Sequence, residues 1–385
     1  MKNLILITSK LLVAVGLIVL SAGCKKLYNL PDEKSYLSTE ADYSTKGFSP
    51  ILGRTTVYTN IFNAVNSTFP INFSILNARY GDGRDGSDIL AVKPTLVWTQ
   101  DYTGKETSLA QIEAKRHLEN RPMLEILGNG DIKLWYTANK SNIKPADSLV
   151  APQDQHFFDV KVSNSGGTRI ISNLTITPTI DQPYYPVADY NTITGLPNTT
   201  TPGGHILVYN YVDALSGIVG ETTNSAMNDP RNSTTGLVYL YIRKFVDQPG
   251  DSTNTAAKGH RLRIKVLDKD SVAISPTKFN TTTWADQIHG FKKDGTPGGD
   301  VYHKYVEYNV AYPIPLAVIP TKYTVGGINN QTGGDKAQIN LTYSRVGFGG
   351  TTQIGKITQS FQIFEEGDWE IVFHFKTENP KFVND

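Results

Sequence analysis

Short segments in which apolar and polar residues alternate recur along most of the chain, and they constrain its fold more than any other feature. Examples are QHFFDVKVSN (155–164), TRIISNLTITP (168–178) and KITQSFQIFEE (356–366). Successive side chains of a β-strand point to opposite faces of the sheet, so a period of two predicts half-buried strands. Gly, Pro and Asn separate the segments, as expected for turns. The sequence therefore predicts a fold of the all-β class, in which strands are the main elements.

Three turns predict hairpins. PMLEIL (122–127) and DIKLWYTA (131–138) flank GNGD, and SGG separates the segments 155–164 and 168–178. Gly and Asn tolerate the positive φ that tight hairpin turns require. DWEIVFHFK (368–376) follows the segment 356–366 after Gly367, which predicts a third hairpin.

One segment departs from the strand pattern. In TSLAQIEAKRHLEN (107–120), Ser108 stands three residues before Gln111, which is the spacing of a capping box. Leu109, Ile112 and Leu118 fall near one helical face, so we expect one short helix near residues 107–120.

Strands at short spacing favour tandem β-sandwich (immunoglobulin-like) domains, of which the length of 385 residues allows two. The small, polar, turn-rich segment 248–259 predicts a boundary at residue 250. We therefore expect β-sandwich domains over 48–250 and 251–385. A break at 148–153 is the alternative.

The first 23 residues are typical of a bacterial export signal. Lys2 is followed by an uninterrupted apolar run at 11–20, which is shorter than the ~20 residues of a membrane-spanning helix. SAG (21–23) then leads into Cys24, and the arrangement resembles the lipobox, in which the cysteine becomes the acylated first residue of the mature chain. Ser21 occupies the place where Leu is usual. An ordinary secretory signal with an incidental cysteine is the alternative.

Cys24 is the only cysteine, so the exported chain can form no internal disulfide. Acylation would consume this thiol and anchor the protein to a membrane, with several acyl chains giving stable attachment. Residues 24–47 are polar and without clear periodicity, which predicts a lipidated tether. We expect a lipid-anchored protein of the outer membrane, and Lys25 and Lys26 leave open whether it faces the surface or the periplasm.

Charge and motif content limit the classes of function. The chain has 37 Lys and Arg against 36 Asp and Glu, and this balance argues against a nucleic-acid partner. No two of the seven His residues are two or four positions apart, and there is no GxSxG or phosphate-binding loop. We therefore expect neither a cofactor nor an enzyme.

Two acidic segments are candidate sites. In GDGRDGSD (81–88), Asp82, Asp85 and Asp88 offer oxygen ligands of the kind that Ca²⁺ prefers, but Arg84 and Gly86 break the EF-hand pattern. These aspartates are weak metal candidates, and a solvent-exposed turn is the favoured interpretation. EEGDWE (365–370) gathers four carboxylates, but around a glycine turn, where acidic residues are common.

Aromatic residues in predicted loops are the remaining functional signal. Tyr184 and Tyr185 stand between two prolines, with Tyr190 nearby, and Trp284 follows a run of threonines. Rings presented by rigid loops can stack on sugar faces or anchor a protein interface. The favoured alternative is that they close the end of a sandwich.

Five segments together resemble a Bacteroidetes lipoprotein family of unknown function. They are IEAKRHLENRPMLEI (112–126), FFDVKVSNSGGTR (157–169), KFNTTTWADQIHGF (278–291), YSRVGFGG (343–350) and GDWEIVFHFKTENPKF (367–382). Members of such families often accompany glycan-uptake systems of the starch-utilisation type. The resemblance implies an accessory protein of the cell envelope, and it assigns no catalytic residue.

We therefore expect a non-catalytic cell-envelope lipoprotein that binds a polysaccharide or assists an outer-membrane glycan importer. A structural or adhesive surface protein, fimbrial or of a matrix, is the first alternative. A glycan-active enzyme is the second, and it requires two carboxylates in one cleft, separated by ~5 to 10 Å.

Overall fold

The computed structural model describes residues 35–146, 150–199, 208–245, 259–292, 304–326 and 333–385. The predicted signal and Cys24 lie outside the described residues. Within these ranges, no helix has the length and hydrophobicity needed to cross a membrane.

The chain is mainly β, as predicted. The N-terminal strands are β1 (Asp42–Tyr43), β2 (Gly47–Phe48), β3 (Thr56–Tyr58), β4 (Phe62–Asn63), β5 (Asn72–Tyr80), β6 (Val92–Trp98), β7 (Arg116–Pro122), β8 (Leu124–Ile126), β9 (Ile132–Leu134), β10 (His156–Asn164) and β11 (Gly167–Ile176). The later strands are β12 (Tyr184–Tyr185), β13 (Asn210–Tyr211), β14 (Ala214–Ser216), β15 (Val238–Lys244), β16 (Arg261–Leu267), β17 (Gly290–Lys292), β18 (Val306–Val310), β19 (Ala337–Val346), β20 (Thr352–Ile363) and β21 (Trp369–Phe375). The helical elements are α2 (Leu109–Glu113) and four 3₁₀ turns at Ser87–Leu90, Pro276–Lys278, Trp284–Asp286 and Phe348–Gly350.

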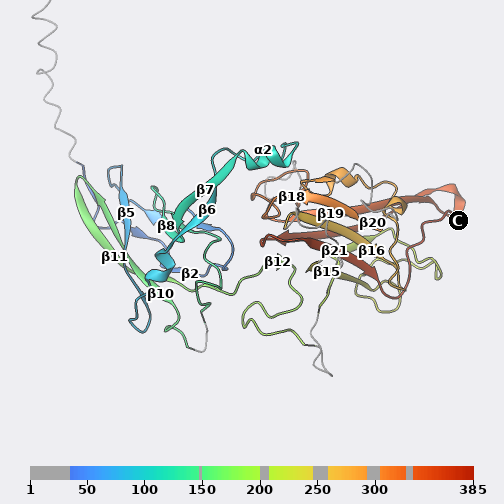
Figure 1. Cartoon of the computed structure of the whole chain (residues 1–385), viewed down its shortest axis with the longest axis horizontal. Coiled ribbons are helices and arrows are strands. Elements are labelled where there is room, and N and C mark those ends of the chain that lie inside the picture. Colours follow the sequence, from blue (N-terminus) through green and yellow to red (C-terminus); the bar gives the residue numbers. More distant parts are fainter. Residues whose placement is uncertain (1–34, 147–149, 200–207, 246–258, 293–303, 327–332) are drawn as a thin grey trace, which may run out of the picture.

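Two hydrophobic cores divide these elements into two units that lie end to end (Figure 1). We call residues 35–176 the N-terminal unit, whose buried core runs from Leu37 to Ile176, and residues 184–385 the C-terminal unit, whose buried core runs from Tyr184 to Phe375. The boundary expected at residue 250 lies outside the described residues, as does most of the segment 248–259. The described strands on either side of it, β15 and β16, both pair with β21 and contribute to the second core.

The N-terminal unit contains two predicted hairpins. β10 pairs with β11, and β8 with β9, so the turns at SGG and GNGD are confirmed. The main sheet has the order β2-β11-β10-β5, and a second sheet has the order β3-β9-β8. The described end of the expected tether, residues 35–47, belongs to this unit, because Leu37 and Tyr43 are buried in its core.

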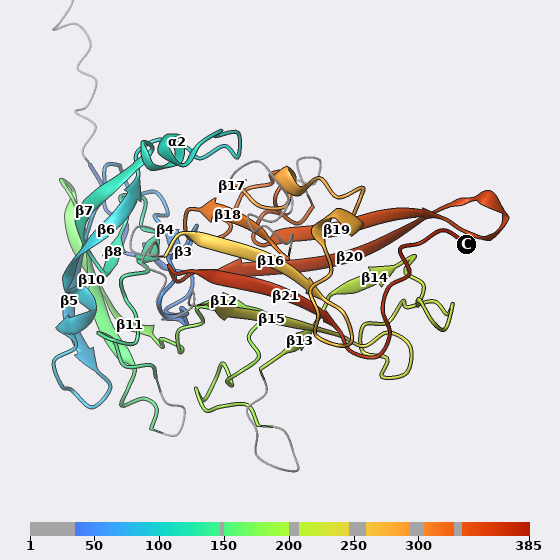
Figure 2. The ribbon, with the colours of Figure 1, turned by 45° about the vertical axis from the view of Figure 1, so that its right-hand side comes forward.

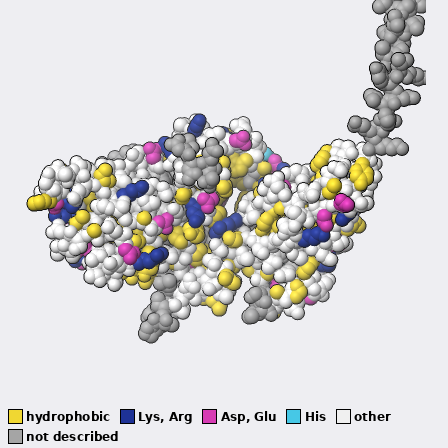
Figure 3. All heavy atoms as spheres, turned by 180° about the vertical axis from the view of Figure 1, so that it is seen from behind, with side chains coloured by type: hydrophobic (Ala, Val, Ile, Leu, Met, Phe, Trp, Pro, Cys, Tyr) yellow, Lys and Arg dark blue, Asp and Glu magenta, His cyan; other side chains and the backbone are white. Residues whose placement is uncertain are grey.

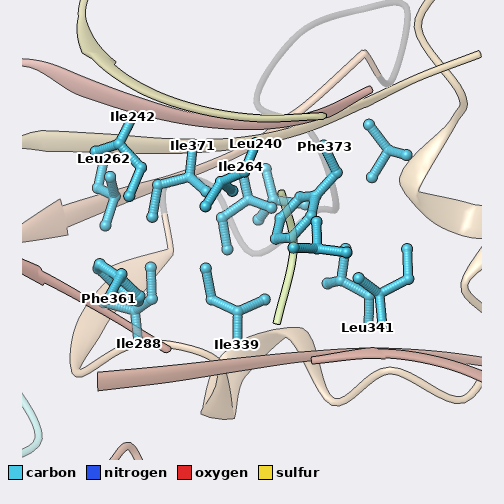
Figure 4. Packing of buried hydrophobic residues seen from close by; sticks show 14 of the residues in the cluster. Leu240, Ile242, Leu262, Ile264, Ile288, Ile339, Leu341, Phe361, Ile371 and Phe373 are labelled. Atoms are coloured by element: carbon cyan, nitrogen blue, oxygen red, sulfur yellow. The ribbon is translucent and has the colours of Figure 1, made fainter. Parts of the chain in front are cut away.

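The C-terminal unit is a β-sandwich. One sheet has the order β13-β15-β21-β16-β18-β17, and the other joins β12, β14 and β19 to β20. Leu240, Ile264, Ile371 and Phe373 of the six-stranded sheet face residues of the second sheet, such as Ile339 (Figure 4). Alternate residues of β20 are buried, as the period of two predicts.

The third predicted hairpin is wrong. β20 and β21 are consecutive strands, but β20 pairs with β19 whereas β21 lies between β15 and β16. The chain crosses from one sheet to the other at Gly367. All seven residues of β21 are buried, so this strand is covered on both of its faces. The apolar residues of such a segment identify it as a strand, but they do not identify the strands with which it pairs.

The helix is shorter than predicted. α2 has five residues, and its N-cap is correct, since the Ser108 side chain accepts a hydrogen bond from the Gln111 backbone N–H. From Arg116 the chain forms β7, which pairs with β6 along seven residues. Leu118 is therefore 66% exposed on a strand, and not on an apolar helical face.

The β6–β7 hairpin and the loop at its end, residues 99–115, form an arm that reaches the C-terminal unit (Figures 1 and 2). Tyr102 and Ile112 of the arm are buried in a small apolar cluster with Ala311 and Leu316. Arg116, the first residue of β7 and directly after the loop of the arm, donates to the Tyr312 carbonyl at 2.7 Å. The arm thus holds the two units together beyond the chain connection at residues 177–183.

Candidate tyrosine face

Four tyrosines gather on the outer face of the six-stranded sheet. Val238, Leu240 and Ile242 of β15 point into the core, so the alternating residues Tyr239 and Tyr241 point outward. β13 pairs with β15 so that Tyr211 lies opposite Tyr239. Tyr209, two residues before Tyr211, shares its face. We call Tyr209, Tyr211, Tyr239 and Tyr241 the tyrosine face.

The four rings form one contiguous cluster. Tyr209 and Tyr239 are stacked, with centroids 3.7 Å apart and an interplanar angle of 11°. Tyr211 meets the Tyr239 ring edge-on at 5.9 Å, and Tyr241 meets it at 6.4 Å. All four side chains are partly exposed. Such aromatic pairs rigidify one another, so the cluster presents a pre-arranged surface.

Cationic side chains surround these rings. The Arg231 guanidinium lies 5.6 Å from the Tyr211 centroid, the Lys376 ammonium 5.9 Å from Tyr239, and the Arg243 guanidinium 5.7 Å from Tyr241. Hydrogen bonding with the Tyr239 hydroxyl, together with burial, raises the pKa of Tyr209, so its phenol stays neutral. The face therefore offers aromatic surface, neutral hydroxyl groups and positive charge at its edges.

This combination of groups suits a sugar. An exposed aromatic ring gains dispersion energy against the C–H face of a pyranose, and phenol hydroxyls can donate to and accept from sugar hydroxyls. The nearby guanidinium and ammonium groups can also donate to hydroxyl or carboxylate oxygens.

The tyrosine face is not among the sites predicted from the sequence, although the sequence contains its signal. The strand-like segments 205–212 and 237–246 each contain Tyr-x-Tyr, at 209/211 and at 239/241. A spacing of two places both tyrosines of a strand on one face. Only the pairing of β13 with β15 brings the two pairs together, and that pairing is a tertiary feature.

The loop aromatics singled out from the sequence do not form one surface. Trp284 is 8% exposed and packs in the core of the C-terminal unit against Phe279. Tyr184 is 7% exposed, packs on Trp369, and donates to Asp189 at 2.7 Å.

Tyr190 and Tyr185 are more accessible, but both already contact other groups of the protein. The Tyr190 hydroxyl donates to the Asp181 carbonyl at 3.0 Å, and burial raises its pKa. The Tyr185 ring is 38% exposed, and the Lys336 ammonium lies 4.4 Å from its centroid.

The three aspartates of the 81–88 loop have separate protein partners. Asp82 pairs with Arg84 at 2.6 Å, and Asp85 accepts from the Ser87 hydroxyl at 2.8 Å. Asp88 accepts from the Tyr80 hydroxyl at 2.6 Å and lies 3.0 Å from His156 Nε2. Nowhere in the described ranges do three or more His, Cys, Asp or Glu side chains converge as a metal site would require.

Three of the four acidic residues at 365–370 form ion pairs along the sheet. Glu365 pairs with Lys244 at 2.5 Å and Asp368 with Arg261 at 2.6 Å. Glu370 pairs with Arg243 at 2.7 Å and with Lys265 at 3.1 Å. Burial opposes the ionisation of Glu370, but these two cations outweigh it and lower its pKa.

Comparison with known proteins assigns a family but no activity. No curated protein matches the chain, and no solved structure does. The family described as a domain of unknown function, DUF5007, matches residues 62–384, and the chain belongs to this family. The matched region covers most of the N-terminal unit and nearly all of the C-terminal unit, including the arm and the tyrosine face.

Proposed function

We propose that this DUF5007 protein is a non-catalytic, glycan-binding lipoprotein of the cell envelope, and that it serves as an accessory to an outer-membrane glycan importer. The tyrosine face is the observation that carries the proposal. It combines stacked rings, neutral hydroxyls and flanking cations on a rigid sheet, which is what binding a sugar chain without transforming it requires.

The state of the acidic residues supports a non-catalytic role. A glycosidase needs a carboxylic acid that is protonated near neutral pH and a second carboxylate beside it. Glu370 and Asp368 are held in ion pairs with basic side chains. The two cations beside Glu370 lower its pKa in spite of its burial, so this carboxyl is poorly suited to donate a proton.

The sequence of the N-terminus supports the location. Cys24 follows a short apolar segment and small residues, as in a lipobox, and its acylation would attach the protein to the outer membrane. The segments that resemble Bacteroidetes lipoproteins of starch-utilisation-type systems support an importer as the partner. Lys25 and Lys26 leave undecided whether the protein faces the cell surface or the periplasm.

The first prediction tests the tyrosine face. Soluble protein comprising residues 25–385 should bind at least one member of a polysaccharide panel in affinity electrophoresis. Tyr211→Ala and Tyr241→Ala should each weaken that binding by about fivefold, which corresponds to ~1 kcal/mol of lost aromatic contact. Tyr36→Ala is the matched control, because Tyr36 is 51% exposed but belongs to the N-terminal unit. Failure to bind any glycan, with no importer co-purifying, would disprove the proposal.

An assembly role has one observation in its favour. Phe348, at the tip of the β19–β20 hairpin, is 92% exposed, with Val346 and Ile354 at 39% and 60%. An exposed apolar tip is typical of a contact with another protein, as in a fimbrial or matrix component. Light scattering distinguishes this alternative: self-association that Phe348→Ser abolishes would favour it, and a strict monomer at high concentration would exclude it.

A further inference from the structure

A cleft of about 550 Å³ lies between the arm and the C-terminal unit. Residues 103–107 of the arm form one wall, and residues around Gly290 and Thr321 form the other. Ligand sites in proteins commonly have volumes of ~300 to 1,000 Å³ and often lie between domains. Apolar side chains gather in the hollow where the two units meet (Figure 3). This cleft is separate from the tyrosine face, with which it shares no residue.

The floor and walls of the cleft are held rigidly. His289 stacks on Tyr323, with centroids 4.6 Å apart and an interplanar angle of 7°. His289 also hydrogen-bonds the Tyr102 hydroxyl through Nδ1 and donates from Nε2 to the Glu106 carbonyl at 2.8 Å. These contacts fix the Tyr323 ring, which lines the cleft together with Phe291. The site therefore has pre-arranged aromatic walls.

The charged residues that line the cleft are two lysines and one glutamate. Lys105 and Lys322 line it from opposite sides, one on the arm and one on the C-terminal unit. Among the described residues the Lys105 ammonium has no ion-pair partner, whereas Lys322 is bonded to Asp286 at 2.5 Å. Glu106 is the one carboxylate among the residues that line the cleft, and Lys115 and Thr103 already bind its Oε1.

Glu106, a residue that lines the cleft, has a carboxylate oxygen that remains free to accept a hydrogen bond. Glu106 Oε2 is buried and has no hydrogen-bond partner among the described residues. An unsatisfied buried acceptor is costly, so a hydroxyl group that reached it would be bound strongly. Burial opposes ionisation of Glu106, but hydrogen bonds from Lys115 and Thr103 outweigh it and hold its pKa at about 2.

We propose that this cleft is a second binding site, and that it takes a uronic acid, a sugar ring that carries one carboxylate. The ring would lie against Phe291 and Tyr323, its carboxylate between Lys105 and Lys322, and a ring hydroxyl toward Glu106. The inference does not rest on glycan binding by the tyrosine face, since it uses separate residues and predicts binding of a monosaccharide.

A ligand-observed NMR titration with glucuronate tests the site on the soluble chain, residues 25–385. Glucuronate should bind at least about tenfold more tightly than glucose, which lacks the charge, or acetate, which lacks the ring. Lys105→Ala should weaken glucuronate binding by about tenfold, as expected for one lost hydrogen bond to a charged group. Lys105→Glu should abolish it.

Two controls keep the test specific. Lys140→Ala removes a lysine that is also exposed but lies outside the cleft, and it should change nothing. Tyr36→Ala, which lies outside both sites, should leave glucuronate binding intact. Loss of polysaccharide binding with glucuronate binding retained would separate failure of the tyrosine face from failure of this site. Lys105 is exposed on a loop, and unchanged melting temperatures would show that its variants fold. The inference would be overturned if glucose bound as tightly as glucuronate. It would also be overturned if Lys105→Ala and Lys105→Glu bound glucuronate as tightly as the wild type does.

Discussion

At the scale of single residues, the contact between arm and C-terminal unit depends on a neutral histidine. The Glu106 carbonyl can only accept a hydrogen bond, so His289 Nε2 carries the proton and Nδ1 accepts from the Tyr102 hydroxyl. Burial lowers the pKa of His289 below its ordinary value, against the opposing effect of Glu106. Lys322 disfavours the charged form further.

This arrangement predicts a loss of stability in mild acid. A histidine whose pKa is lowered by folding binds a proton more readily when unfolded, so stability is full above the ordinary pKa of ~6.5 and falls as the pH drops below it. Between pH 7.5 and 5.5 the melting temperature should fall, and His289→Gln should reduce that dependence.

The matched control is His117→Gln. The His117 side chain is 50% exposed, so this variant should keep the wild-type slope of melting temperature against pH. Burial also lowers the pKa values of His156 and His374, and the remaining slope in His289→Gln would report on these two residues. An identical slope in wild type and His289→Gln would show that the arm contact does not depend on this proton.

At the scale of elements, the arm shows how tertiary contacts decide local structure. The capping box correctly marks where the helix begins, because an N-cap is a local hydrogen bond. The end of the helix is not local. Arg116 to Pro122 form a strand because β6 provides seven partners for them. A local sequence pattern does not show whether a pairing strand exists about twenty residues away in the chain.

Gly104 allows a test of how closely the arm packs against the C-terminal unit. Its φ is +73°, and an added Cβ would lie 2.5 Å from Thr321 Cγ2 on the C-terminal unit. Gly104→Ala should therefore both strain the backbone and displace the arm. Gly83 has a similar φ of +87° but nothing within 4 Å, so Gly83→Ala isolates the backbone cost, about 1 kcal/mol.

Chemical denaturation measures the difference. Gly104→Ala should lower the free energy of unfolding by clearly more than Gly83→Ala does. Equal losses would mean that Thr321 moves aside without cost and that the arm is loosely seated.

At the scale of the whole molecule, two cores are joined by few contacts. Besides the arm, Arg54 of the N-terminal unit lies 3.7 Å above the Phe364 ring and donates to the Gln182 carbonyl at 3.0 Å. The first described residues lie at one end of the molecule, and the tip of the β19–β20 hairpin lies at the other (Figure 1). A lipid at Cys24 would leave that tip free to point away from the membrane.

Removing the end of the arm should loosen the two units. Replacing residues 100–114 with a short turn deletes Tyr102 and Ile112, and with them the apolar contact to Ala311 and Leu316. Small interfaces between domains permit relative motion, so small-angle scattering should show a larger radius of gyration than for the wild type. An unchanged radius would mean that the Arg54 contact and the connecting segment suffice to hold the units.

The sequence by itself determined the mainly β class, two hairpins and the start of the helix, because each is encoded by neighbouring residues. The export signal and the acylation of Cys24 stay predictions. Tertiary structure decided which strands pair, where the cores divide, and which aromatics are exposed. Trp284 and Tyr184 are core residues, while Tyr-x-Tyr pairs about thirty residues apart form one face. Periodicity specifies two faces for each strand, but only packing decides which strands adjoin and what covers them.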